Sequence, residues 1–160
     1  MNPKERFINA LLGKPKDYTP PTCVTQIAIV EAMDALNAKW PEAHKDPQKM
    51  ATLGASLYEL AELETARIPF CLTVIADALG AKADLGTVNI QPSVREHPVA
   101  SADQFEIPED FLERGRIPVV LEATKILKEK WGNTLPILVG FEAPMTLAGH
   151  LVGTEKLLIW

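Results

Sequence analysis

LPILVGF, residues 135–141, decides the fold, because it is a continuous apolar run of strand length. Such a run is typical of a parallel strand that is buried on both faces of a sheet. A second short apolar run, residues 66–70, follows a helical segment and also reads as a buried strand. The order strand, helix, strand, helix with right-handed crossovers therefore predicts an α/β chain with a parallel sheet.

Capping signals define the elements that precede these strands. Asn2 followed by Pro3 predicts a helix that ends at Gly13. The prolines after it leave residues 19–24 as a brief strand or an extended segment. An apolar stripe at three-residue intervals then predicts a helix over residues 25–39, which the next proline must end.

A second helix start lies at Asp46 and Pro47, and the apolar spacing predicts that this helix continues through Leu60. Residues 81–99 lose the helical period and gain glycine and proline between β-favouring residues, which indicates an irregular excursion with a strand or hairpin.

Further helix signals lie before and after the predicted strand of residues 135–141. Ser101 and Gln104 have the spacing of a capping box, and an apolar face predicts a helix that ends at Gly132. A turn at residues 142–144 follows the strand, and a last capped helix begins at Thr154.

Composition and charge exclude several classes of function. The formal net charge is −5 and the isoelectric point is near 5.2, which disfavours a nucleic-acid partner because phosphate binding needs clustered Lys and Arg. Apolar runs are all shorter than the roughly 20 residues that span a bilayer. Cys23 and Cys71 form neither a disulfide framework nor a cysteine-rich zinc module, so a reducing cytoplasm fits best.

Common catalytic motifs are absent from the sequence: it has no phosphate loop, no dinucleotide-binding glycine pattern, no H-E-x-x-H and no G-x-S-x-G. His44, His97 and His150 are isolated from one another. We expect each of them to be structural or solvated, because a lone histidine is weak evidence for a site.

Candidate site residues follow the predicted strands, because ligand groups in open α/β sheets and in barrels lie at strand carboxyl ends. Glu142 directly follows the strand that contains residues 135–141, and Cys71 and Thr73 follow the earlier one. Gln26 lies at the end of the first extended segment. A buried cysteine is more often inert than reactive, but topology predicts that these four side chains converge on one mouth.

Three segments carry a resemblance to a known family. NPKERFINALLGKPKDYTPP at 2–21, RIPFCLTVIADALGA at 67–81 and VGFEAPMTLAGHLVGTEKLL at 139–158 resemble the amino-terminal half of the uroporphyrinogen decarboxylase superfamily. Within it they are most similar to the methylcobamide:coenzyme M methyltransferases of methanogens. The resemblance implies that residues 1–160 are the amino-terminal half of a single (β/α)8 TIM barrel domain, which is incomplete and truncated.

Departures from the decarboxylase pattern favour the methyltransferase branch. Decarboxylases of this family carry an R-Q-A-G-R segment after the first strand and an aspartate in an F-S-D motif after the second. Here the first region reads Thr25-Gln26-Ile27-Ala28, and Cys71 stands about where the aspartate would be. The alternatives that stay open are a related decarboxylase acting on another acid substrate, and a stand-alone half-barrel binding module that forms a homo-oligomer to cover its strand edges.

The resemblance implies a corrinoid-dependent methyltransferase, in which a thiol such as coenzyme M takes a methyl group from a methylated corrinoid protein. In this family a zinc ion binds the thiol. Coordination to zinc removes the thiol proton and leaves the reactive thiolate. The family's ligands are a His-x-Cys pair and a later cysteine in the second half of its chain, so zinc is expected in the full-length parent and this fragment alone is expected to be inactive. The implied site-lining positions are Phe70, Cys71, Thr73, Glu142, Pro144 and Thr146.

Overall fold

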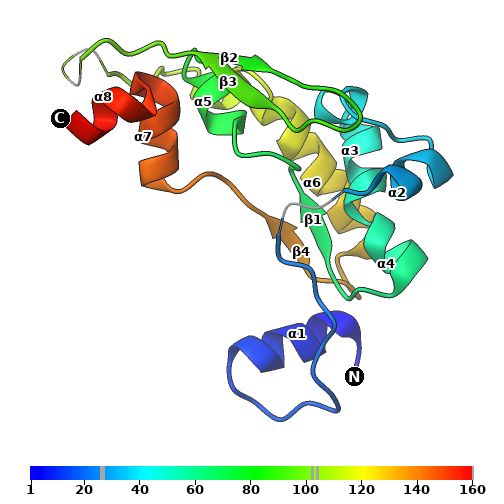
Figure 1. Cartoon of the computed structure of the whole chain (residues 1–160). Helices are drawn as coiled ribbons and strands as arrows, with labels where there is room; N and C mark the ends of the chain where they lie inside the picture. The colour runs from blue at the N-terminus through cyan, green and yellow to red at the C-terminus, as the bar shows by residue number, and fades with distance from the viewer. Residues whose placement is uncertain (26–27, 102, 104, 160) are drawn as a thin grey trace.

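A computed structural model describes residues 1–25, 28–101, 103 and 105–159 of the chain. Helices make up most of it, and short strands lie between them, as Figure 1 shows. In chain order the elements are α1 (Pro3–Leu11), α2 (Val30–Ala35), the 3-10 helix η1 (Glu42–His44), α3 (Pro47–Gly54), α4 (Ser56–Ala61), β1 (Ala66–Ile68), α5 (Val74–Ala78), β2 (Lys82–Asp84), β3 (Ser93–Glu96), the 3-10 helix η3 (Phe111–Glu113), α6 (Ile117–Trp131), β4 (Ile137–Val139), α7 (Pro144–Val152) and α8 (Thr154–Ile159).

The two apolar runs form a parallel pair, as predicted. β1 pairs with β4 in a register that places Ala66 beside Ile137 and Ile68 beside Val139. Both strands are shorter than the runs that contain them. Pro69 follows β1 directly, and proline cannot donate a hydrogen bond to a strand ladder, which explains where that strand ends.

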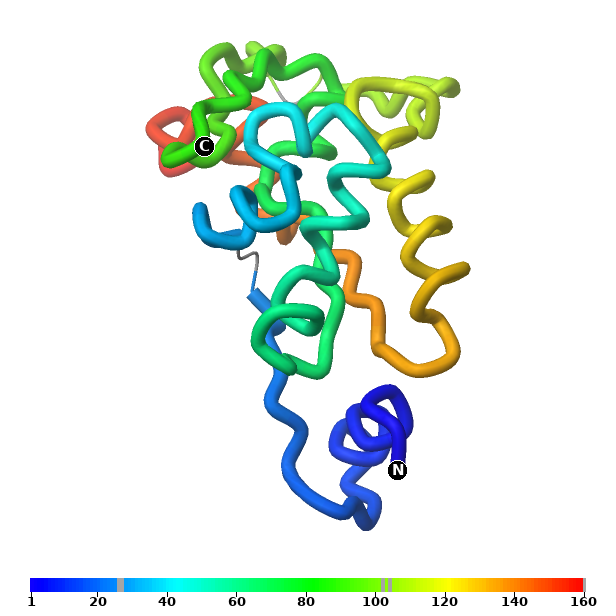
Figure 2. Tube along the Cα trace, turned by 90° about the vertical axis from the view of Figure 1, so that its right-hand side faces the viewer, coloured from blue at the N-terminus to red at the C-terminus, as the bar shows by residue number. Residues whose placement is uncertain are grey.

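The irregular segment after α5 is an antiparallel hairpin of β2 and β3, which confirms the predicted excursion. Figures 1 and 2 show this hairpin and α7–α8 at one end of the molecule and α1 at the opposite end. The backbone N–H of Lys4 in α1 donates to the carbonyl of Thr134, just before β4 begins. The hairpin and α7–α8 therefore lie at the end toward which the strands run.

α1 begins as its capping signals predict. Asn2 and Glu5 form a reciprocal capping box, and Pro3 is the first helical residue. Arg6 anchors the helix: its buried guanidinium donates to Asp17 at 2.6 Å and to both oxygens of Glu64 at 2.6 and 2.7 Å. These charge-assisted bonds tie α1 and the loop after it to the turn before β1.

Residues 19–24 are extended and lie alongside the start of β1, without forming a strand within the described part of the chain. The carbonyl of Pro21 accepts from the backbone N–H of Glu64, and the hydroxyl of Thr65 bonds both the N–H and the carbonyl of Cys23. The Thr65 side chain thus takes the place of ladder bonds at Cys23.

The predicted helix over residues 25–39 is wrong in extent, since α2 covers only Val30–Ala35. Ile29 has extended φ and ψ angles of −106° and 149°, and Asn37 has a left-handed φ of 50° that ends the helical course. Met33 is buried as expected, but Val30 is exposed. Leu36 continues the apolar stripe past the last residue of the helix and packs against the core from the C-cap position.

The predicted helix start at Asp46 is confirmed, but the prediction of one continuous helix through Leu60 is wrong. Asp46 accepts from the N–H of Lys49, but α3 ends at Gly54 and α4 begins after Ala55. Ala55 interrupts the helical course between α3 and α4, and Leu60 of α4 is 52% exposed instead of extending the buried stripe.

The predicted helix end at Gly132 is confirmed, because α6 begins at Ile117 and its C-cap residue is Gly132. The predicted capping box of Ser101 lies outside the described residues, because its partner Gln104 is not among them. The predicted turn at residues 142–144 leads into α7, and the last helix begins at Thr154 as expected. None of the helices that the structure describes is both long and apolar enough to cross a membrane.

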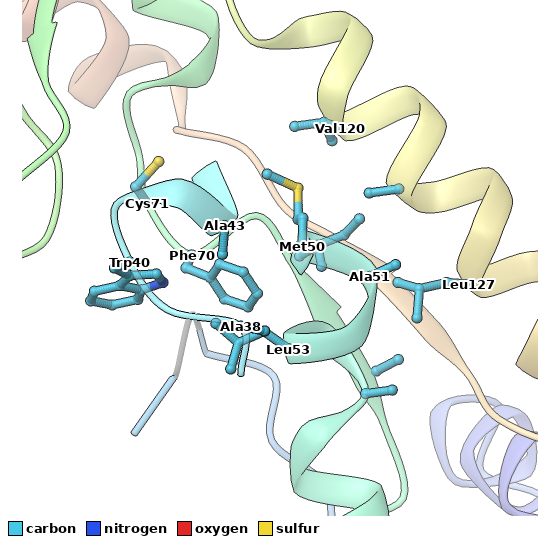
Figure 3. Close-up of a cluster of buried hydrophobic side chains, with 14 of the residues drawn as sticks. Ala38, Trp40, Ala43, Met50, Ala51, Leu53, Phe70, Cys71, Val120 and Leu127 are labelled. Carbon is cyan, nitrogen blue, oxygen red and sulfur yellow. The ribbon is translucent and has the colours of Figure 1, made fainter. Parts of the chain in front are cut away.

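The main core lies between β1 and the helices that cover one face of the parallel pair. Figure 3 shows side chains of α3, α6 and the residues after β1 meeting there. Complete burial of one large apolar side chain is worth roughly 1.5–3 kcal/mol, so this cluster holds the short strands in place. Its largest fully buried members include Phe70, Met33, Met50, Leu53, Ile68 and Leu127.

Gly54 sets the distance between α3 and β1. A Cβ atom at this position would lie 2.5 Å from Cγ2 of Ile68 and 3.3 Å from the carbonyl oxygen of Arg67. We predict that Gly54→Ala lowers the free energy of unfolding by roughly 1–3 kcal/mol, because the helix must move away from the strand. Urea unfolding would measure the change.

Gly149→Ala in α7 is the matched control. Its added Cβ would meet Thr154 at an ordinary distance of 3.4 Å, and alanine favours a helix over glycine by about 1 kcal/mol. Equal stability losses in both variants would contradict the proposed close contact at Gly54.

Candidate functional site at the carboxyl ends of the strands

A buried arginine organises the residues that follow β1. Arg116, the residue before α6, is 6% exposed and surrounded by acceptors. Its Nη1 donates to Cys71 Sγ at 3.3 Å, and its Nη2 donates to Thr73 Oγ1 at 2.7 Å and to the Thr73 carbonyl at 3.2 Å. Nε donates to Asp77 Oδ2 at 3.0 Å in an ion pair with α5.

Electrostatics keep this guanidinium charged inside the protein. Burial lowers the pKa of Arg116, but Cys71 and Asp77 raise it by more, so the pKa lies above its ordinary value. The hydroxyl of Thr73 also donates to Cys71 Sγ at 3.4 Å. Two donors, the Thr73 hydroxyl and Arg116 Nη1, therefore contact the Cys71 sulfur and hold it in position.

Glu142 joins the end of β4 to the helix that follows β1. Its side chain is 7% exposed, and Oε1 accepts from the backbone N–H groups of Ile75 and Ala76, both at 3.0 Å. Thr73 occupies the N-cap position of α5, but its hydroxyl is engaged with Arg116 and Cys71. Glu142 thus supplies the cap of α5 from 66 residues away in the chain.

The two carboxylate oxygens of Glu142 differ in their hydrogen bonding. Within the described residues, its Oε2 is buried and has no hydrogen-bond partner. Buried polar atoms are usually satisfied, so this oxygen is the feature of Glu142 that keeps it a candidate site residue.

Phe70 lies in the core instead of lining an open mouth. It is completely buried, and its ring centroid is 6.1 Å from that of Trp40 and 6.2 Å from that of His44. His44 is itself fully buried, and in the part of the chain that the structure describes neither ring nitrogen has a hydrogen-bond partner. Its expected structural role agrees with this position.

The predicted site residues Thr73, Pro144 and Thr146 border three different cavities near the carboxyl ends of the strands. Thr73 borders a cavity of about 380 Å³ between the hairpin and α7–α8, and other polar residues of its lining are Gln91, Ser93, His97, His150 and Thr154. Pro144 borders an apolar cavity of about 370 Å³ with Leu147 and Leu151. Thr146 borders a third, of about 290 Å³.

The structure therefore connects some of the predicted site residues and leaves others apart. Arg116 links Cys71 with Thr73, and Glu142 bonds to the helix that Thr73 precedes. Pro144 and Thr146 lie on α7 beside other cavities, and Gln26 lies outside the described residues. Direct contact of these positions with a substrate stays a prediction.

Sequence reasoning missed Arg116, Asp77 and Arg67. Arg116 occupies a helix N-cap position, where a small polar residue is usual, and this departure was the available signal. Arg67 interrupts an apolar strand, which is also unusual for a buried element. Nothing in the sequence indicates that Asp77 forms an ion pair with Arg116.

The described residues do not fit a zinc site. Among them, no group of three or more His, Cys, Asp or Glu side chains is close enough together to hold a metal ion. Structural and catalytic zinc sites both need at least three protein ligands. We therefore derive no chemical step through a metal from these residues.

Comparison with known proteins identifies the family. The family model described as uroporphyrinogen decarboxylase (URO-D) matches residues 2–160. Methylcobamide:CoM methyltransferase MtaA of Methanosarcina barkeri is 48% identical over 158 residues, which cover 98% of this chain and 47% of the relative. Methylcobamide:CoM methyltransferase MtbA of Methanosarcina acetivorans is 42% identical over 152 residues, with coverages of 94% and 45%.

A solved structure agrees with this result. A methyltransferase from Methanosarcina mazei is 46% identical and superposes with a TM-score of 0.96, covering 100% of this chain and 48% of that one. The chain belongs to the uroporphyrinogen decarboxylase family, and the resemblance inferred from its three segments is confirmed. It spans about half the length of the relatives that it matches.

Capping by Glu142 makes a specific prediction. Glu142→Ala should lower the free energy of unfolding by roughly 1–3 kcal/mol, because two backbone N–H groups lose their acceptor. Glu142→Gln should retain most of the stability, since an amide oxygen can still accept both bonds. Urea unfolding would compare the two with Glu122→Ala, an exposed position on α6 whose loss should stay within about 0.5 kcal/mol. Equal losses in the Gln and Ala variants would contradict the capping role.

His44 makes the stability depend on pH. Burial first, and the nearby charge of Arg116 second, lower the pKa of His44 from 6.5 to about 3. Between these values the unfolded chain binds a proton that the folded chain does not, so stability falls as the pH decreases through this window. The slope is about 1.4 kcal/mol per pH unit.

His44→Phe should remove this component while keeping an aromatic ring beside Trp40 and Phe70. Urea unfolding between pH 7.5 and pH 4 is the measurement, with the value at pH 7.5 as the baseline for each protein. Stability curves of the two proteins that run parallel over this range would refute the prediction.

Proposed function

We propose that this chain forms the amino-terminal half of a (β/α)8 barrel whose complete form is a corrinoid-dependent methyltransferase. The observation that carries the proposal is 48% identity to a methylcobamide:CoM methyltransferase across 98% of this chain. The parallel pairing of β1 with β4 is the arrangement that a barrel of this class requires. The described strands form two separate pairs, so closure of a barrel would need further strands.

In the proposed reaction, the sulfur of a small thiol such as coenzyme M takes a methyl group from a methylated corrinoid protein. The sulfur–carbon bond forms as the cobalt–carbon bond breaks and leaves its electron pair on cobalt, and the thiol proton is released. Zinc would activate the thiol, with ligands from outside these 160 residues, because the described part of this chain offers no ligand cluster. This chain alone would therefore be inactive.

The residues after β1 and β4 would form one wall of the substrate site. Arg116 holds Cys71 and Thr73 in position, and Glu142 fixes the β4 loop against α5. This network keeps the strand ends rigid, which a site needs if it is to orient two reactants. The proposed lining positions are Gln26, Cys71, Thr73, Glu142, Pro144 and Thr146, and the buried Phe70 supports this wall from the core.

The activity test uses the product of the whole reading frame that contains these residues. Purified protein should consume methylcobalamin when a thiol is added and form the methyl thioether, whereas omission of the thiol should leave methylcobalamin unchanged. Decarboxylation of a porphyrinogen without methyl transfer would refute the proposal. Bound zinc would be measured on the same preparation.

Two matched variants test the role of the network. Thr73→Val removes an acceptor of Arg116 and a donor to Cys71, so we expect turnover to fall by roughly 10-fold or more. Thr124→Val is the control, because its hydroxyl bonds only within α6, to the carbonyl of Val120 at 2.7 Å. Equal turnover in both variants would exclude a role for the network in the site.

A further inference from the structure

A larger cavity, of about 590 Å³, lies at the end of the molecule that carries α1, away from the carboxyl ends of the strands. Pro3 and Arg6 of α1, Tyr58 of α4 and Trp131 of α6 contribute to its lining. Both aromatic residues also pack against the main core. The walls therefore come from α1 and from the helical layer over the parallel pair, and not from an open edge or the bare face of the sheet. A cavity of this volume suits a small molecule.

Acidic side chains dominate the charge around this cavity. Its lining contains the carboxylates of Glu59, Glu62 and Glu64 and the guanidinium of Arg6. Arg6 is already paired with Glu64 and with Asp17, at 2.6 Å each. Glu59 is paired with a lysine, but Glu62 is exposed and forms no ion pair with any residue that the structure describes. One carboxylate of the lining is therefore left without a counter-ion.

Two helices also end at this cavity. The C-cap residue of α4 is Glu62, and the last residue of α6 is Trp131. Lys4 of α1 donates from its ammonium group to the carbonyl of Gly132, just past the end of α6. A helix C-terminus carries partial negative charge on its last carbonyl groups. The backbone and the acidic side chains thus share one electrostatic preference, for a cation.

The chain places an ammonium group of its own on the wall of this cavity. Lys130 Nζ lies 2.8 Å from Oε1 of Glu59 and 5.0 Å from the centroid of the Trp131 ring. An ammonium group over the face of a tryptophan is a favourable arrangement that proteins use to bind organic cations. Tyr58 meets the same ring edge to face, with the centroids 5.2 Å apart, and so supports its orientation. Lys130 indicates the ligand chemistry that this wall accepts.

We propose that this cavity binds a small organic molecule that carries ammonium groups, such as a short aliphatic diamine. One ammonium group pairs with Glu62, and the aliphatic chain lies against Tyr58 and Trp131. A neutral molecule of the same length lacks the charge that Glu62 and the two helix ends recognise. The site is separate from the strand ends at which methyl transfer is proposed, so this inference does not rest on that function.

Isothermal titration calorimetry on the product of the whole reading frame tests the proposal with 1,4-diaminobutane and with neutral 1,4-butanediol. We expect saturable binding of the diamine and no binding of the diol. Glu62→Gln should weaken binding of the diamine by roughly 3- to 10-fold, because it removes the charge and keeps the shape of the side chain. Glu122→Gln is the matched control, since it removes an exposed carboxylate earlier on α6 and should leave binding unchanged.

Lys130→Met removes the ammonium group that occupies Glu59 and Trp131, so the diamine should bind roughly 3-fold more tightly or better. Lys125→Met removes the same charge elsewhere on α6 and should leave binding unchanged. Both lysines are highly exposed, at 62% and 64%, so neither variant is expected to unfold. The inference is overturned if the diamine shows no saturable binding, if the diol binds equally well, or if each control variant changes binding as much as its counterpart. Because calorimetry needs no turnover, failure of methyl transfer would refute only the proposed function.

Discussion

The parallel pairing of β1 with β4 is the constraint on which the rest of the structure depends. A parallel pair cannot be closed by a tight turn, so α5, the hairpin and α6 all lie in the connection between these strands. Each strand has only three residues, and its backbone bonds alone would not stabilise it. Packing of α3 and α6 against Ala66 and Ile68 supplies what the short ladder lacks, and the same packing directs Arg67 to the other face.

The fold could be predicted where the signal is local. The cap at Asn2, the cap at Asp46 and the apolar run of β4 each define their element within a few residues, and the structure confirms them. Extents were wrong where tertiary contacts override the apolar period. α2 is short because Ile29 is extended before it and Asn37 is left-handed after it, and α3 ends at Gly54, where the helix approaches Ile68. Neither fact is visible in a periodic pattern.

The candidate site was predicted in part, for a similar reason. Position after a strand pointed to Cys71, Thr73 and Glu142, because chain topology fixes where strand ends lie. Their connection depends on Arg116, which is 45 residues from Cys71 in sequence. The long Arg116 side chain bonds a sulfur, a hydroxyl and a carboxylate from distant parts of the chain, so no regular sequence spacing identifies it. Such a network can be read only from the folded chain.

Capping of α5 by Glu142 has a consequence for the order in which the chain folds. α5 has five residues, far fewer than the roughly 12–15 that make even a good isolated helix marginal in water. Its first N–H groups gain their acceptor only when a residue 66 positions later has docked. During synthesis on the ribosome, we therefore expect α5 to become stable only after β4 and its following loop have emerged, so that the ends of both strands become ordered together.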